Sequence, residues 1–259
     1  MQAKKEARKM PQPQIESNAD EKDVSTASQP RSTMSLKAKV ALRLSLGLVI
    51  GPSIVFIPAG TWKFWQGWVF LAILYVPAFA IFLYFLKHDP QLIERRLRFK
   101  EKVREQQLLM RWVKPLFFGA FMLPGFDYRF GWSRDWLGEV PLWLTVISEA
   151  MVLAGYLSVA WVLNVNRFAG RTIEVEAGQT VISSGPYRFV RHPLYAGSAV
   201  LCLFTPLALG SCIALPAFVL LLPFYVFRLL NEEKVLCAQL PGYSEYCLRT
   251  RYRLIPFVW

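Results

Sequence analysis

Residues 193–230 read PLYAGSAVLCLFTPLALGSCIALPAFVLLLPFYVFRLL, which is two apolar runs joined at Gly210-Ser211. Such a short connection predicts an antiparallel pair of helices. His192 lies eighteen residues before Gly210, and Leu229 lies eighteen residues after Ser211. Because both helices rise by the same distance per residue, the two arms of this hairpin are expected to end at the same depth.

Polar side chains gather at the open end of this predicted hairpin. His192 and Tyr195 stand at one arm, and Arg228 and Glu232 stand at the other, so all four are expected to meet at one membrane face. Arg228 and Glu232 are four residues apart and share a helix face, which allows an ion pair within the helix as well as contacts to a ligand. His192-Pro193 also suits a simple helix start.

The composition indicates a membrane protein. The chain is 54% hydrophobic and only 19% charged, which is too apolar for an ordinary soluble domain. The net charge of +12 comes from basic residues beside apolar runs, as the positive-inside rule describes, so no nucleic-acid partner is expected. Four cysteines without C-x-x-C spacing and two histidines predict no metal site.

The hydropathy pattern predicts an all-α, polytopic integral-membrane protein with about six transmembrane helices. Each crossing of the bilayer core needs about 20 apolar residues. The third run barely qualifies and has a re-entrant segment as its alternative, and a loop is expected after it at 127–139. The fourth run contains Glu149, a carboxylate that must find a partner or a proton. The six runs are 40–59, 67–86, 112–126, 140–163, 193–209 and 212–230.

The chain divides into three predicted regions. Residues 1–35 are polar without periodicity and are expected to form a disordered tail. Residues 36–163 form an N-terminal transmembrane region, and residues 164–259 form a C-terminal region that holds both polar clusters. Six spans place the basic segments on the cytoplasmic side, and with them the open end of the hairpin. The expected location is a membrane, the inner one in a bacterium.

The C-terminal region carries a set of short motifs in fixed order. From about Thr172 to Trp259 this set resembles the isoprenylcysteine carboxyl methyltransferase family and the related phospholipid methyltransferases. The motifs are Gly185-Pro186-Tyr187, Arg191-His192-Pro193-Leu194-Tyr195 with Gly197, Glu232-Glu233, Gly242-Tyr243-Ser244-Glu245-Tyr246 and Arg253-Leu254-Ile255-Pro256.

The resemblance implies a methyltransferase region at 164–259 that binds S-adenosylmethionine at the cytosolic ends of the last spans. The implied reaction is carboxyl methylation of an isoprenylcysteine-like or other lipid-linked acceptor, with phospholipid N-methylation as the alternative. Arg228 falls at the position that contacts the acceptor, and Arg228 and Glu232 are the expected catalytic residues. The implied cofactor contacts are Gln179, Thr180, Val181, Ile182, Tyr187, His192, Pro193, Leu194, Tyr195 and Glu232.

The residue types suit that chemistry. Glu232 can hold the ammonium of the cofactor by a charge-assisted hydrogen bond. Tyr187 or Tyr195 can cover the adenine or attract the sulfonium through its ring. A carboxylate acceptor needs no general base, so catalysis would consist of alignment and water exclusion. Arg228 could orient that carboxylate with a two-pronged contact.

Two other classes of protein remain as alternatives. Membrane sterol-type reductases share R-H-P-x-Y-x-G and bind NADPH, but they usually have Asn before the tyrosine and Glu after the glycine, where this chain has Leu194 and Ser198. A transporter or membrane scaffold is the non-enzymatic alternative. Ion-coupled transporters place ionisable residues near the middle of the membrane, where this chain offers Glu149.

Overall fold

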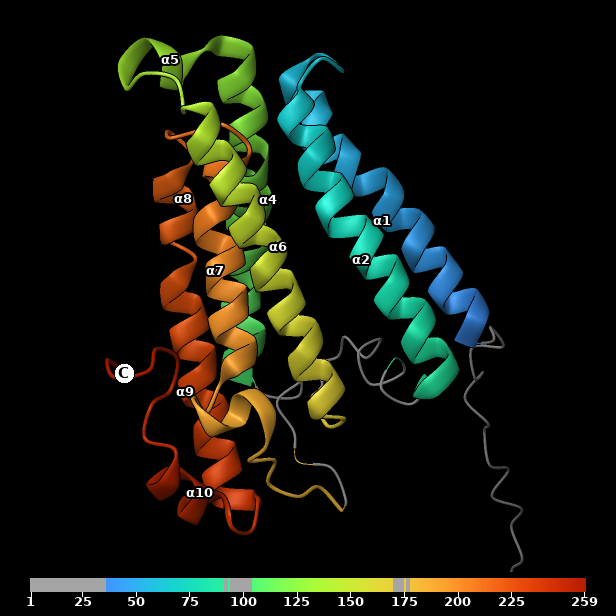
Figure 1. Ribbon diagram of the computed structural model, residues 1–259, viewed down its shortest axis with the longest axis vertical. Coiled ribbons are helices and arrows are strands. Elements are labelled where there is room, and N and C mark those ends of the chain that lie inside the picture. Colours follow the sequence, from blue (N-terminus) through green and yellow to red (C-terminus); the bar gives the residue numbers. More distant parts are fainter. Residues whose placement is uncertain (1–35, 91–92, 94–103, 170–174, 176–177) are drawn as a thin grey trace, which may run out of the picture. The chain divides into compact units, whose positions relative to one another are not determined.

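The structure is a computed structural model in which every element of the described residues is a helix (Figure 1). It describes residues 36–90, 93, 104–169, 175 and 178–259. The predicted disordered tail therefore lies outside the described residues. The prediction of an all-α membrane protein is confirmed.

The helices follow one another with short connections through most of the described chain. Their bounds are α1 (Leu36–Ala59), α2 (Trp65–His88), α4 (Arg104–Phe130), α5 (Trp132–Trp136), α6 (Leu142–Val165), η1 (Gly185–Arg188), α7 (Pro193–Ala208), α8 (Leu215–Val219), α9 (Leu222–Gln239) and α10 (Tyr243–Arg249).

Among the described residues, four helical segments are long and apolar enough to cross a membrane, which makes this a multi-pass protein. They are Ala41–Ala59, Trp65–His88, Leu142–Val165 and Leu215–Gln239. The other two predicted spans also lie in helices but fall short of this standard. The fifth is α7, which has only 16 residues. The third lies within α4, whose hydropathy is lowered by Arg111 and Lys114.

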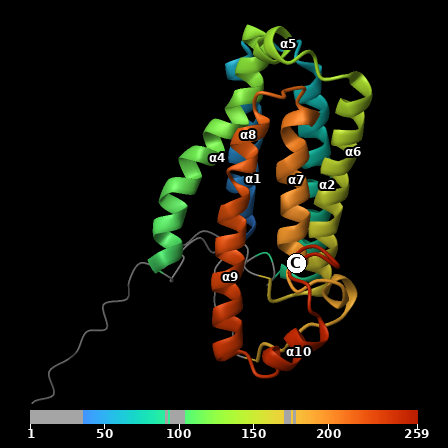
Figure 2. The ribbon, with the colours of Figure 1, turned by 90° about the vertical axis from the view of Figure 1, so that its left-hand side faces the viewer.

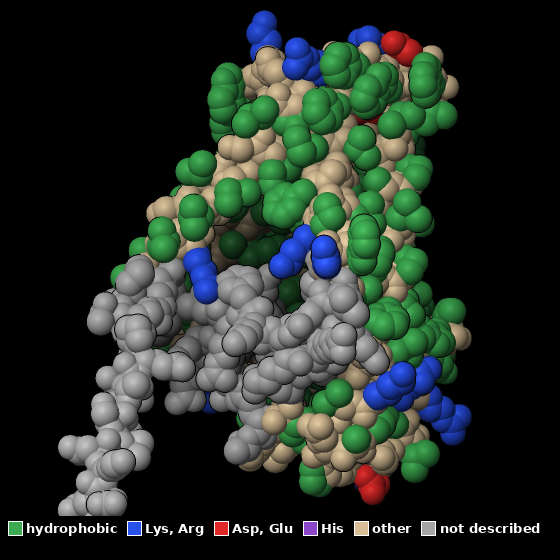
Figure 3. Space-filling view, turned by 180° about the vertical axis from the view of Figure 1, so that it is seen from behind, with side chains coloured by type: hydrophobic (Ala, Val, Ile, Leu, Met, Phe, Trp, Pro, Cys, Tyr) green, Lys and Arg blue, Asp and Glu red, His purple; other side chains and the backbone are tan. Residues whose placement is uncertain are grey.

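The outer surface has the distribution of side chains that a bilayer requires. Figure 3 shows a broad area of hydrophobic side chains on one face, with Lys and Arg side chains above and below it. Exposed aromatic residues include Trp62 between α1 and α2, Trp65 at the start of α2 and Trp136 at the end of α5. Tryptophan at the limits of an apolar band is typical of the membrane–water interface.

Among the described helices, α6 and α7 have the most extensive contact, and they run side by side in Figures 1 and 2. Two glycines permit this approach. A Cβ atom on Gly155 would lie 3.0 Å from the carbonyl oxygen of Gly197, and a Cβ atom on Gly197 would collide with the Ser158 hydroxyl. Small residues at helix contacts are the usual means of close packing in membranes. This contact fixes the position of the first turn of α7.

The second arm of the hairpin differs from the predicted single helix. After α7 the chain turns through residues 209–214, forms the single short helix α8 and then begins α9. Pro216 and Pro223 lie in the first turns of α8 and α9, where proline is tolerated because its missing N–H has no helical partner there. The break between α8 and α9 arises because Pro223 has no N–H group to donate to the carbonyl of Val219, the last residue of α8.

Asp127 holds the turn between α7 and α8 in place. It is only 3% exposed, and its Oδ1 atom accepts a hydrogen bond of 2.6 Å from the backbone N–H of Ser133. The hydroxyl groups of Ser133 and Ser211 both donate to Oδ2. Ser133 Oγ in turn accepts the backbone N–H groups of Cys212 and Ile213, at 3.0 and 3.1 Å.

This network corrects the prediction of a loop at 127–139. The helix α4 continues to Phe130, and α5 forms at Trp132–Trp136 because Ser133 is fixed by Asp127. Glu149 meets no such partner. It is 5% exposed, and neither of its carboxylate oxygens has a hydrogen-bond partner among the residues that the structure describes.

Replacement of Asp127 by alanine should strongly destabilise the protein. The change leaves a buried N–H group and two hydroxyl groups without their acceptor, at a cost of about 3 kcal/mol. Thermal unfolding of the purified protein in detergent should show a drop of roughly 6–12 °C. Asp135→Ala is the control, because the Asp135 side chain is 56% exposed and pairs with Arg134 at the surface. Equal shifts in both variants would contradict the assigned role of Asp127.

Candidate functional site

Tyr195 and Glu232 join the two arms of the hairpin. The Tyr195 hydroxyl donates a hydrogen bond of 2.6 Å to Glu232 Oε2, across 37 residues of sequence. Tyr195 is buried in the first turn of α7, whereas Glu232 is half-buried in α9. Arg228 is a further hydrogen-bonding neighbour of the Tyr195 hydroxyl and lies one helical turn before Glu232. The predicted meeting of Tyr195 with Arg228 and Glu232 is therefore confirmed.

His192 occupies the position immediately before α7 and is 4% exposed. Its backbone N–H donates to the Arg253 carbonyl at 3.0 Å, and its ring lies 6.0 Å from the ring of Tyr195. Burial, assisted by the positive charges of Arg191 and Arg253, lowers the pKa of the ring to about 3. The imidazole is consequently neutral near pH 7. Its Nε2 atom has no hydrogen-bond partner among the described residues.

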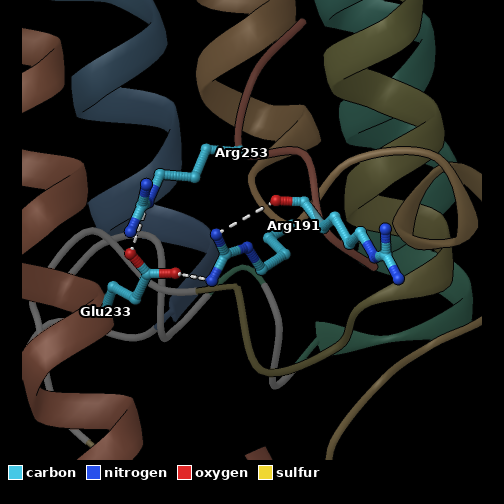
Figure 4. Close-up of polar contacts among 4 residues, drawn as sticks. Arg191, Glu233 and Arg253 are labelled. Atoms are coloured by element: carbon cyan, nitrogen blue, oxygen red, sulfur yellow. Dashed lines mark hydrogen bonds and ion pairs between the residues drawn. The ribbon is translucent and has the colours of Figure 1, made fainter. Parts of the chain in front are cut away.

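A buried ion triad lies beside His192 (Figure 4). Glu233 points between two guanidinium groups: its Oε2 atom accepts a hydrogen bond of 2.7 Å from Arg253 Nε, and its Oε1 atom pairs with Arg191. The side chains of Arg191 and Glu233 are each only 10% exposed. Arg191 also donates to the Arg251 carbonyl at 3.2 Å. The triad therefore attaches the C-terminal residues, 251–259, to the start of α7 through Arg251 and Arg253.

The backbone strengthens this attachment. The N–H of Arg191 donates to the carbonyl of Tyr252 at 2.8 Å, next to the bond from His192 to Arg253. Arg253 also places its guanidinium 5.4 Å from the ring of Trp259. The sequence motifs include Arg253 and Glu233 but give no sign that they pair. Their roles were missed because the contact joins residues twenty positions apart, one in α9 and the other in the non-helical segment after α10.

A second group of side chains forms around Tyr187 in η1. Its hydroxyl accepts a hydrogen bond of 2.7 Å from Asn166 Nδ2, and its carbonyl accepts one of 2.8 Å from the Tyr246 hydroxyl. Val181 packs in the same cluster as Tyr243 and Tyr246 of α10. The structure therefore brings Val181 and Tyr187, two of the predicted cofactor contacts, together on α10.

The other predicted contacts are more scattered. Gln179 and Ile182 are half-buried beside Val181, and Thr180 is exposed. Pro193 begins α7 and is buried on its α6 side, while the Leu194 carbonyl accepts the Ser198 hydroxyl at 2.8 Å.

Two further residues qualify for the site although no role was predicted for them. Asn231 and Tyr243 are buried, and Asn231 Nδ2 and Tyr243 Oη lack hydrogen-bond partners among the described residues. Burial and the neighbouring charges of Glu232 and Glu233 raise the pKa of Tyr243. Buried polar groups are normally satisfied, so unpartnered ones beside a half-buried carboxylate are candidates for ligand contacts. Their signals in the sequence were the N-E-E and G-Y-S-E-Y runs.

The burial of His192 predicts a pH dependence of stability. The unfolded chain takes up a proton at this position as the pH falls below 6.5, whereas the folded chain resists it down to about 3. Stability is therefore lost as the pH falls through this window, by about 2 kcal/mol between about pH 7 and about pH 5. Thermal unfolding of His192→Asn should lack this component of the acid sensitivity.

The control for this experiment is His88→Asn, which replaces the exposed histidine at the end of α2. It should retain the acid sensitivity of the unmodified protein. The assignment fails if the stability of His192→Asn falls with pH as steeply as that of the control.

Comparison with known proteins places this site within a recognised sequence pattern. Residues 143–240 match the family model described as phospholipid methyltransferase, a stretch that includes Tyr187, His192, Tyr195, Arg228 and Glu232. The chain is also 34% identical over 93 residues to Delta(14)-sterol reductase TM7SF2 of Mus musculus. That match covers 34% of this chain but only 22% of the reductase, so the chain spans less than a quarter of that curated relative.

A solved structure of the eukaryotic intramembrane Ras methyltransferase ICMT (isoprenylcysteine carboxyl methyltransferase) is also similar. It has a TM-score of 0.43 and 19% sequence identity, over 85% of this chain and 76% of that chain. The family resemblance that the motifs predicted is confirmed by the sequence match: this chain carries, in residues 143–240, the sequence pattern of the phospholipid methyltransferase family.

Proposed function

We propose that this protein is an S-adenosylmethionine-dependent methyltransferase that acts in a membrane on a lipid-linked acceptor. The observation that carries the proposal is the hydrogen bond from Tyr195 to Glu232, with Arg228 beside it, inside the residues that match the family. In this proposal residues 36–163 form the membrane region and residues 164–259 form the methyltransferase region. The site faces the cytoplasm, and the membrane is the inner membrane if the source is a bacterium.

The residues at the site fit the proposed cofactor. Glu232 is half-buried and supplies a carboxylate for an ammonium group. His192, Asn231 and Tyr243 supply buried polar atoms that have no partner among the described residues, as expected of groups that a ligand would complete. Tyr187 supplies a ring held in place by Asn166. When bound, S-adenosylmethionine supplies an electrophilic methyl group on a positively charged sulfur.

The chain's own contribution is charge and alignment. The neutral His192 adds no positive charge to a site that must accept a cation. The Tyr195 hydroxyl contacts both Arg228 and Glu232, so it fixes the distance between the proposed acceptor-binding and cofactor-binding side chains. The C-terminal residues, held by Glu233, lie against the start of α7 and help to exclude water. With the acceptor carboxylate already ionised, these effects suffice for methyl transfer.

The choice of acceptor follows from Arg228. A guanidinium at the membrane face favours a carboxylate, which it can bind through two parallel hydrogen bonds. The isoprenylcysteine-like carboxylate is therefore the preferred acceptor. The family model's description favours a phospholipid amine as the second candidate.

Cofactor binding by the purified protein tests the first half of the proposal. Calorimetric titration should show that S-adenosylmethionine binds and that Glu232→Gln weakens this binding by about 10- to 100-fold, the cost of one charge-assisted hydrogen bond. The matched control is Glu245→Gln, which makes the same change on the exposed face of α10. Binding of NADPH instead, or equal binding by both variants, would reject the assignment.

Product analysis tests the second half. Membrane extracts incubated with methyl-labelled cofactor should give base-labile esters, whereas stable N-methyl products would identify the phospholipid alternative. Arg228→Lys should reduce ester formation at least about tenfold, because lysine cannot make the two-pronged contact. Its affinity for S-adenosylmethionine should change far less. A loss of both in parallel would contradict a role of Arg228 toward the acceptor.

A further inference from the structure

An apolar groove lies between α6, α7 and residues 254–256; it shares Pro193 with the predicted cofactor contacts but does not include Tyr195, Arg228 or Glu232. Its volume is 330 Å³. Ala154 and Trp161 of α6 form one wall, Ala196 of α7 forms another, and Phe189 with Leu254 borders the end nearest to η1. The hydroxyl of Ser158, a polar group in the lining, donates to the Gly155 carbonyl at 2.7 Å, so it is satisfied internally. The groove therefore suits a hydrocarbon ligand.

The geometry of α7 separates this groove from the Tyr195–Glu232 pair. The groove is lined by Pro193, Ala196 and Val200, which share one face of the helix. Successive residues are about 100° apart around a helix, so Tyr195 projects about 200° from Pro193. A molecule in the groove would therefore lie on the opposite side of α7 from Glu232, and it would not be the methyl acceptor.

The groove lies between a side that faces the membrane interior and an end that faces the aqueous interface. Its α6 wall belongs to a helix long and apolar enough to cross a membrane, and Trp161 in that wall is half exposed. At the η1 end the flanking residues are basic. Arg188 follows the lining residue Pro186 within η1, and Arg251 lies three residues before Leu254; both arginines are exposed.

The nearby acidic residue, Glu233, is already neutralised by ion pairs. Glu233 pairs with both Arg191 and Arg253, so the ion triad itself keeps one positive charge. Among the described residues named here, the end of the groove is thus net positive while its walls are apolar. We propose that the groove binds a hydrocarbon chain of an anionic membrane lipid, whose headgroup lies at Arg188 and Arg251.

The lipid would reinforce the attachment of the C-terminal residues. Leu254 and Pro256 line the groove, and the carbonyls of Tyr252 and Arg253, just before them, accept the N–H groups of Arg191 and His192. The hydrocarbon chain of a lipid held between α6 and these residues would add apolar contacts that stabilise the same attachment. Anionic lipid should therefore stabilise the folded protein.

Quenching of tryptophan fluorescence tests the proposal on the full chain in phosphatidylcholine nanodiscs. Brominated phosphatidylglycerol should quench a component that is absent in Trp161→Phe. Ala154→Phe, which fills the groove from an exposed position, should abolish that component. Leu157→Phe is the control, because Leu157 is exposed on the same helix but does not line the groove.

The arginines are tested in the same assay. The double variant Arg188→Ala, Arg251→Ala should need about tenfold more phosphatidylglycerol for the same quenching and should respond equally to brominated phosphatidylcholine. Three results would overturn the proposal: equal quenching by both lipids in the unmodified protein, equal effects of Ala154→Phe and Leu157→Phe, or a dimer in light scattering that Ala154→Phe dissociates. No methyl transfer is measured, so the outcome is independent of the proposed function.

Discussion

The structure depends on the neutralisation of one buried carboxylate. Glu233 brings a negative charge to a place where little water can solvate it, and Arg191 and Arg253 approach it from two non-helical segments. Removal of either partner from such a pair is expensive because the remaining charge stays buried. The helix α9, the entrance to α7 and the C-terminal residues are therefore joined at one point. The backbone bonds of Arg191 and His192 rely on that junction.

The adjacent residues Glu232 and Glu233 of α9 have different partners and different roles. Side chains of consecutive residues on a helix diverge by about 100°. Glu233 accordingly faces the two arginines, whereas Glu232 faces Tyr195. Glu233 is a structural charge that is neutralised by Arg191 and Arg253. Glu232 is half-buried and lies next to polar atoms that have no hydrogen-bond partner in the described part of the chain, as a ligand-binding carboxylate would.

Much of this arrangement was accessible from the sequence. Residue counting along the hairpin predicted that Tyr195 and Glu232 would meet, because helix length converts directly into depth. The motifs predicted the family resemblance that the match over residues 143–240 supports. The break between α8 and α9 was harder, since proline in an apolar run is compatible with either a kink or a new helix start. The role of Asp127 was not predictable, because its partners Ser133 and Ser211 lie 6 and 84 residues away.

The C-terminal attachment also determines when the site can form during synthesis. The partners of the Arg191 and His192 N–H groups are residues 252 and 253, which leave the ribosome after all the described long helices. Nascent chains fold from the N-terminal side as they emerge. The helices can therefore enter the membrane while the start of α7 still lacks its backbone partners. Membrane insertion would precede completion of the site, so a partly made chain would be anchored before residues 252 and 253 join the start of α7.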